Sequence, residues 1–128
     1  MALEQSILKS IKKLLHIPEE YDQFDMDVII HINSAFATLH QLGLGPETEF
    51  MIEDDTEEWT AYIGSDSYIQ SVKTYVYLSV RLVFDPPATS FAIAAFEKQL
   101  NELAWRLNVQ REGEKWQDPS LDSSSMSS

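Results

Sequence analysis

Cysteine is absent from this sequence of 128 residues. Its absence excludes disulfide bridges, thiolate metal sites and cysteine nucleophiles. There are only four glycines, and no group of them resembles a loop that binds phosphate. No segment reaches the roughly 20 apolar residues that a membrane span requires, and the N-terminus lacks the pattern of a signal peptide. We therefore expect a soluble, intracellular protein that makes no contact with a membrane.

Positive charge is also scarce. The chain has 9 Lys and Arg against 21 Asp and Glu, a formal net charge of -12. Binding to nucleic acid depends on clustered Lys and Arg that neutralise phosphates. The only local group in the sequence is Lys9, Lys12 and Lys13. Most of the surface should therefore repel nucleic acid.

Recognisable catalytic patterns are missing as well. The three histidines lack paired spacing, and no serine lies in a GxSxG or SxxK setting. Asp25 and Asp27 form a DxD pair, which a helix start explains through the helix dipole. We expect no enzymatic activity, no cofactor and no bound metal.

Helical periodicity of the apolar residues is the main pattern along the chain. Apolar residues recur at helical spacing in four segments: residues 3–15, about 25–42, 66–84 and about 90–111. We expect Asp25 to cap the second helix, Gly43 to close it, and the last helix to start near Thr89 or Ser90. The predicted fold is an all-α bundle of about four main helices. Residues 1–111 form the predicted domain, and residues 112–128 form a flexible, acidic, Ser-rich tail.

An acidic insertion separates the second and third of these helices. Residues 47–58 hold seven acidic residues and no Lys or Arg. The alternation of Phe50 and Ile52 is compatible with a short strand, and Thr56 is a candidate cap for a brief helix that holds Trp59. The insertion is either a solvated acidic loop or a docking surface for a basic partner. The residues assigned to an acidic docking or channel surface are Glu53, Asp54, Asp55, Glu57 and Glu58.

Residues 66–84 are compatible with two structures. Alternation from Val72 to Phe84 fits a strand, but the apolar pattern is longer than the usual 3–10 residues of a strand. On a helix, Gln70, Lys73, Thr74, Tyr77 and Arg81 fall within an arc of about 100° and nearly all the other residues are apolar, so we predict a helix. Its apolar surface is covered either by neighbours in the same chain, the simpler explanation, or partly by another subunit. The candidate residues for a subunit or partner interface are Tyr75, Leu78, Leu82, Phe84 and Trp116.

These segments together resemble a known family. The relevant stretches are "ILKSIKKLLHIP", "DMDVIIHINSAFATLHQLGLGP", "EEWTAYIG" and "VKTYVYLSVRLVFDPPATSFAIAAFEKQLNELAWRLNV". The order is similar to that of the small head–tail connector, or head-completion, proteins of tailed phages with long non-contractile tails. The resemblance covers roughly residues 3–110. Its most specific part is the helix that ends in "FDPP" and the long helix with "ELAWRLN" that follows.

The resemblance implies a structural role in the virion. Such proteins form a ring, commonly of twelve copies, on the portal vertex, where they extend the DNA channel and support the next connector or tail-completion protein. The family implies a small α-helical fold without enzymatic activity, and DNA would pass without specific binding. Assembly would take place in the host cytoplasm, and the free protein is either a monomer or already oligomeric.

A second hypothesis comes from charge alone. An acidic helical regulator that binds a basic protein would have the same net charge and the same acidic insertion at residues 47–58. Composition and spacing do not distinguish this interaction protein from a connector.

Overall fold

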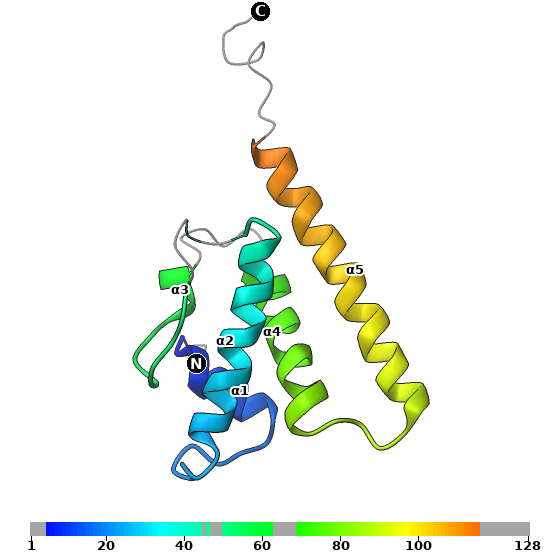
Figure 1. The fold of residues 1–128 in the computed structure, drawn as a ribbon. Coiled ribbons are helices and arrows are strands. Elements are labelled where there is room, and N and C mark those ends of the chain that lie inside the picture. The colour runs from blue at the N-terminus through cyan, green and yellow to red at the C-terminus, as the bar shows by residue number, and fades with distance from the viewer. Residues whose placement is uncertain (1–4, 45, 47–49, 63–68, 116–128) are drawn as a thin grey trace, which may run out of the picture.

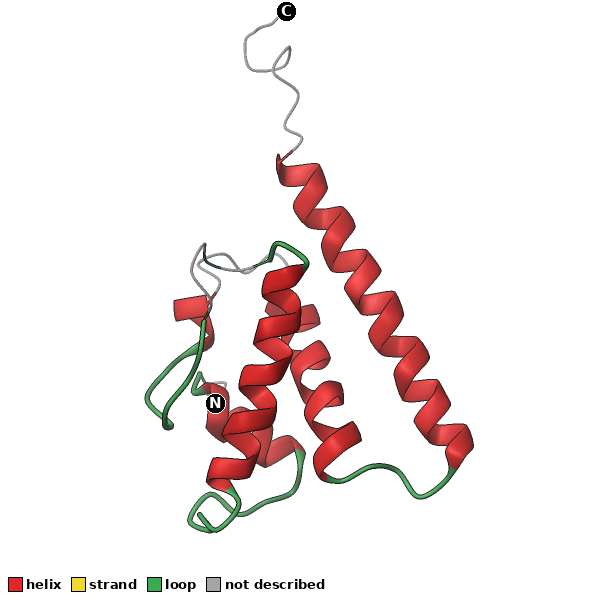
Figure 2. Ribbon diagram, in the orientation of Figure 1, coloured by secondary structure: helices red, strands yellow, loops and turns green. Residues whose placement is uncertain are grey.

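Five helices form the framework of the part of the chain that the structure describes (Figure 1). The computed structural model describes residues 5–44, 46, 50–62 and 69–115, with the side chains of the last helix described through residue 109. The helices are α1 (Ile7–Leu14), α2 (Asp25–Gln41), α3 (Trp59–Tyr62), α4 (Ile69–Phe84) and α5 (Ser90–Lys115). Within these described residues the secondary structure is helical with no strand (Figure 2), so the predicted all-α class is confirmed.

The helix α1 has well-defined caps at both ends. The Ser6 side chain accepts a hydrogen bond from the backbone N–H of Lys9 at 3.2 Å, as expected for an N-cap serine. At the other end, the N–H of His16 bonds to Lys13 and the N–H of Ile17 bonds to Lys12. This is a Schellman motif, and it places His16 at a φ of 64°, in the left-handed region.

The helix α2 ends in the same motif. The N–H of Gly43 bonds to His40, the N–H of Leu44 bonds to Leu39, and Gly43 has a φ of 86°. The predicted glycine closure is therefore confirmed. The predicted cap at the other end is wrong: Phe24 holds the N-cap position, and no side chain there accepts a capping hydrogen bond.

The helix α4 is the centre of the bundle. It packs against α1, α2 and α5, and its buried residues include Val72, Val76 and Val80. The helix, rather than the strand, is confirmed. The simpler explanation for its broad apolar surface also fits, because α2 and α5 contact it as two separate neighbours. The cap candidates at positions 65–67 lie outside the described residues.

The long helix α5 follows Pro86 and Pro87 and lies along the edge of the bundle (Figure 1). Thr89 accepts a hydrogen bond from the N–H of Ala92 at 3.1 Å, which confirms the predicted start. The helix continues to Lys115, past the end expected at residue 111. The predicted tail from residue 116 onward lies outside the described residues.

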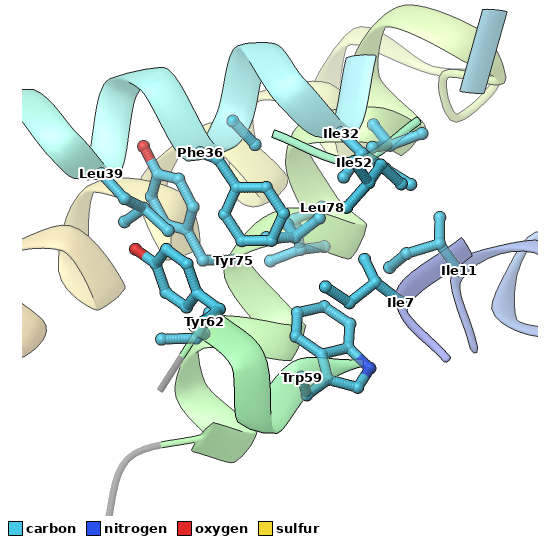
Figure 3. Packing of buried hydrophobic residues seen from close by; sticks show 14 of the residues in the cluster. Ile7, Ile11, Ile32, Phe36, Leu39, Ile52, Trp59, Tyr62, Tyr75 and Leu78 are labelled. Carbon is cyan, nitrogen blue, oxygen red and sulfur yellow. The ribbon is translucent and has the colours of Figure 1, made fainter. Parts of the chain in front are cut away.

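Phe36 lies at the centre of an aromatic group in the core (Figure 3). Its fully buried ring lies 4.6 Å from Tyr62, 5.2 Å from Phe50 and 6.2 Å from Trp59, measured between ring centroids. Aromatic pairs at such separations stabilise beyond the effect of burial alone. The group joins α2, α3 and the segment after residue 49 into one core.

Lys12 is a charged residue inside this fold, with only 3% of its surface exposed. Its ammonium group donates hydrogen bonds to the carbonyl oxygens of Glu19 at 3.1 Å and Tyr21 at 2.8 Å. It also lies 2.8 Å from Oδ1 of Asp25. A buried ammonium needs such acceptors because it has lost its hydration. Lys12 therefore ties α1 to the connecting loop and to the first residue of α2.

We predict that Lys12→Ala lowers the free energy of unfolding by about 2–4 kcal/mol, because it leaves two carbonyls without their donor and the half-buried carboxylate of Asp25 without its ion-pair partner. The matched control is Lys13→Ala, which removes the adjacent, exposed lysine and should change stability by less than about 0.5 kcal/mol. Urea unfolding followed by circular dichroism measures both. Equal midpoints for the two variants would contradict this role for Lys12.

Candidate interaction surfaces

The described part of the acidic insertion, residues 50–58, is called the acidic segment below. It is anchored to the start of α1. The N–H of Ile7 donates to the carbonyl of Glu57 at 3.0 Å, and the N–H of Trp59 donates to the carbonyl of Gln5 at 3.1 Å. Ser6 and Glu58 form the antiparallel bridge between these bonds. Backbone pairing thus holds this part of the segment in a defined position.

The short strand with which the sequence around Phe50 and Ile52 is compatible does not form. A side chain supplies the hydrogen bonds that a partner strand would have made. Residues 50–53 form no strand, and the backbone of Ile52 pairs with the side chain of Asn33 in α2 instead. The N–H of Ile52 donates to Asn33 Oδ1 at 2.8 Å, and Asn33 Nδ2 donates to the carbonyl of Ile52 at 3.0 Å. The amide satisfies both backbone groups, so no partner strand is needed.

Carboxylates organise the tip of the acidic segment. Glu57 accepts hydrogen bonds from the N–H groups of Glu53 at 2.9 Å and Asp54 at 3.3 Å. Asp54 accepts from the hydroxyl and the N–H of Thr56. These bonds from Thr56, chiefly from its hydroxyl, hold the pKa of Asp54 below its ordinary value. The predicted brief helix exists as α3, but the Thr56 side chain bonds to Asp54 rather than capping that helix.

An acidic hollow of about 650 Å³ lies between the acidic segment and α2. Apolar side chains from α1 and α2 form part of its wall, and carboxylates form the rest. Its lining residues are Leu8, Asp22, Asp25, Met26, Ile29, Glu53, Asp54 and Asp55. Three of the five residues assigned to an acidic surface are therefore brought together here, while Glu57 and Glu58 lie where the segment meets α1.

The interface residues predicted on α4 divide into two groups. Tyr75 and Leu78 lie in the core, with 7% and 4% of their surface exposed, and burial raises the pKa of Tyr75. Leu82 and Phe84 are half-buried, and the ring of Phe84 lies 5.3 Å from that of Phe24. Participation of these residues in a subunit contact stays a prediction. Trp116, the fifth candidate, lies outside the described residues.

The outward face of α5, defined by Phe91, Trp105 and Val109, was missed by the sequence reasoning. These side chains are 84%, 70% and 47% exposed. Their positions are separated by about four turns and then by one turn, so they share one side of the helix. The opposite side carries the buried Leu103 and Leu107. A helical wheel of residues 90–111 that includes the apolar residues outside the buried side of Leu103 and Leu107 would have revealed this second apolar stripe.

Comparison with known families favours one of the two hypotheses from the sequence. The family model described as "Phage connector protein" matches residues 7–114. The chain belongs to the phage connector protein family. This supports a general role as a head–tail connector and a component of the virion. Comparisons with curated proteins and with solved structures each found no significant match.

Among the residues that the structure describes, no group of three or more His, Cys, Asp or Glu is placed to hold a metal ion. In the same part of the chain, no helix is long and apolar enough to cross a membrane. The acidic hollow and the outward face of α5 are the features that remain to be explained.

We predict that Asn33→Ala releases the acidic segment of this connector. Loss of two hydrogen bonds should lower the free energy of unfolding by about 2 kcal/mol and accelerate hydrogen exchange of the Ile52 amide. Ser34→Ala, at the exposed neighbouring position, is the matched control. Amide exchange measured by NMR gives the local effect, and unchanged protection at Ile52 in Asn33→Ala would rule out the anchoring role.

Proposed function

We propose that this connector docks as a ring on the portal vertex of the phage head. In that position it extends the DNA channel and forms the platform for the next connector or tail-completion protein. The observation that carries the proposal is the outward face of α5, which leaves large apolar side chains exposed on a helix that is anchored by its other side. Family membership supports the same reading.

The exposure of Trp105 is the strongest part of this observation. At 70% exposure, its indole remains mostly in water, although burial of aromatic surface is favourable. Val109 lies one turn from Trp105 on the same face, and adjacent exposed apolar side chains often mark an interaction site. Tryptophan is also enriched among the residues that dominate binding energy at interfaces. A connector within a ring has neighbours that would cover such a face.

Charge supports the passage of DNA without specific binding. The net charge is -12, and exposed carboxylates gather at Glu53, Asp54 and Asp55. An anionic wall repels phosphate and avoids the strong binding that clustered Lys and Arg produce. The proposal assigns no catalytic step to the chain, and it places assembly in the host cytoplasm before incorporation into the virion. The ring would hold about twelve copies, as the resemblance implies.

Deletion of this gene from the encoding phage tests the proposed function. We expect DNA-filled or leaking heads and separate finished tails, because the platform between them would be missing. Electron microscopy of lysates shows these products, and plaque counts measure the loss of infectious particles. Expression of the wild-type chain from a plasmid is the control and should restore joined particles.

Normal, infectious tailed particles from the deletion phage would overturn the connector role. A block before DNA packaging, with empty precursor heads only, would also contradict it, because the proposed ring acts on heads that have already received DNA.

A further inference from the structure

We infer that the part of the outward face of α5 around Trp105 in one copy seats in the acidic hollow of the next copy. This inference rests on the proposed ring and names the contact that builds it. Trp105 would be the apolar anchor, and the carboxylates around the hollow would face the basic residues beside it. The two surfaces come from different parts of the same chain, so each copy offers one of each.

Basic side chains accompany Trp105 on α5. Lys98 and Arg106 line a shallow depression together with Trp105, Asn101 and Glu102. Lys98, Arg106 and Glu102 are all exposed, so the described side chains here carry two positive charges and one negative charge. In a chain with a net charge of -12, this is a locally positive surface around an exposed aromatic ring.

The acidic hollow has the opposite character. Met26 is 73% exposed and Ile29 is half-buried, so apolar surface is available at its wall. Asp22, Glu53 and Asp55 are exposed around it, whereas Asp25 is engaged by Lys12 at 2.8 Å. The hollow therefore combines an apolar seat with a negative rim, which matches an aromatic anchor between basic side chains.

The fold keeps the two surfaces apart within one chain. The order of packing runs from α1 and α2, through α4, to α5, and the acidic segment lies on the side of the bundle away from α5 (Figure 1). The outward face of α5 is turned away from α4. One chain cannot bring the two surfaces together, so the complementarity can be satisfied only between copies.

A contact of this kind can build a ring. It joins one surface to a different surface, which defines a heterologous contact, and a heterologous contact closes into a ring when the rotation between copies allows it. An isologous dimer would instead place one basic face of α5 against another. Like charges would then meet at Lys98 and Arg106, so charge favours the head-to-tail arrangement.

Cysteine cross-linking in assembled particles tests the contact. The natural chain contains no cysteine, so an introduced pair reports only on itself. The deletion phage is complemented with the full chain carrying Glu102→Cys and Glu53→Cys. Purified particles are then oxidised and run on a non-reducing gel. We expect a ladder of covalent multimers, because every contact in the ring would join position 102 of one copy to position 53 of the next.

Three controls define the result. Each single variant should remain a monomer, and the pair Glu102→Cys with Gln70→Cys, at an exposed position on α4, should give no ladder. A covalent dimer from Glu102→Cys alone would overturn the inference in favour of an isologous contact. A product with the mass of a second protein would assign the face to a different partner. Absence of a ladder in infectious particles would overturn the contact and leave the proposed function standing.

Charge reversal gives an independent test that needs no cross-link. Lys98→Glu with Arg106→Glu should lower plaque counts in complementation at least about tenfold, because like charges would meet at the rim. Glu53→Lys with Asp55→Lys should do the same. Combining all four substitutions should restore the counts, since each reversed face then meets a reversed hollow. Trp105→Ala should weaken the association between copies of the chain about thirtyfold, because it removes the aromatic anchor of the contact.

All these side chains are exposed, so circular dichroism and thermal unfolding should match the wild type. If the four-substitution variant folds but remains as defective as the two double variants, the contact is wrong. If the deletion phage itself makes joined particles, the proposed function fails, and this outcome is separate from any result with the variants.

Discussion

The ammonium group of Lys12 is the interaction on which the arrangement of the first half of the chain depends. It is almost completely buried, and its acceptors come from the connecting loop and from the start of α2. A buried charge is tolerated only where such acceptors are fixed, so the loop and the helix start are held in one geometry. That geometry positions Asp25, which is also part of the acidic hollow. A core requirement and a surface feature therefore share the same carboxylate.

The second constraint is the position of α4 between α2 and α5. Because α4 is covered on both sides, much of its broad apolar surface is used within the chain. Exposed apolar side chains occur on several helices, including Met26 on α2 and Val83 on α4. The helix α5 uses one side for Leu103 and Leu107 and leaves its other side outward. In the proposed ring, this outermost helix would take the role that the sequence suggested for the central one. Burial in the chain, rather than apolar content, decides which helix can meet a neighbour.

Helix positions could be predicted from the sequence because periodicity and caps are local signals. The glycine closure at Gly43 and the start at Thr89 follow from single residues and their neighbours. The role of Asn33 could not be predicted, because its partner Ile52 lies 19 residues away and no local pattern links the two. The buried position of Lys12 could not be predicted either, since a lysine on a helix usually lies in solvent. The spacing of Phe91, Trp105 and Val109 does place them on one side of a helix. The prediction missed this side because it considered only the more regular apolar stripe on α5, which contains Leu103 and Leu107.

In the proposed ring, the strong negative charge of the chain and the local positive surface on α5 would complement each other. Free copies that each carry a charge of -12 repel one another at distances beyond the Debye length of about 8 Å only weakly at physiological salt, but repulsion grows as copies approach. The positive patch beside Trp105 would lower that repulsion in the head-to-tail orientation of the proposed contact. Charge would then select the head-to-tail approach, and the aromatic anchor would supply the affinity. Weak association in solution and firm association on a template are both consistent with such a contact, because a template supplies the high local concentration that the free protein lacks.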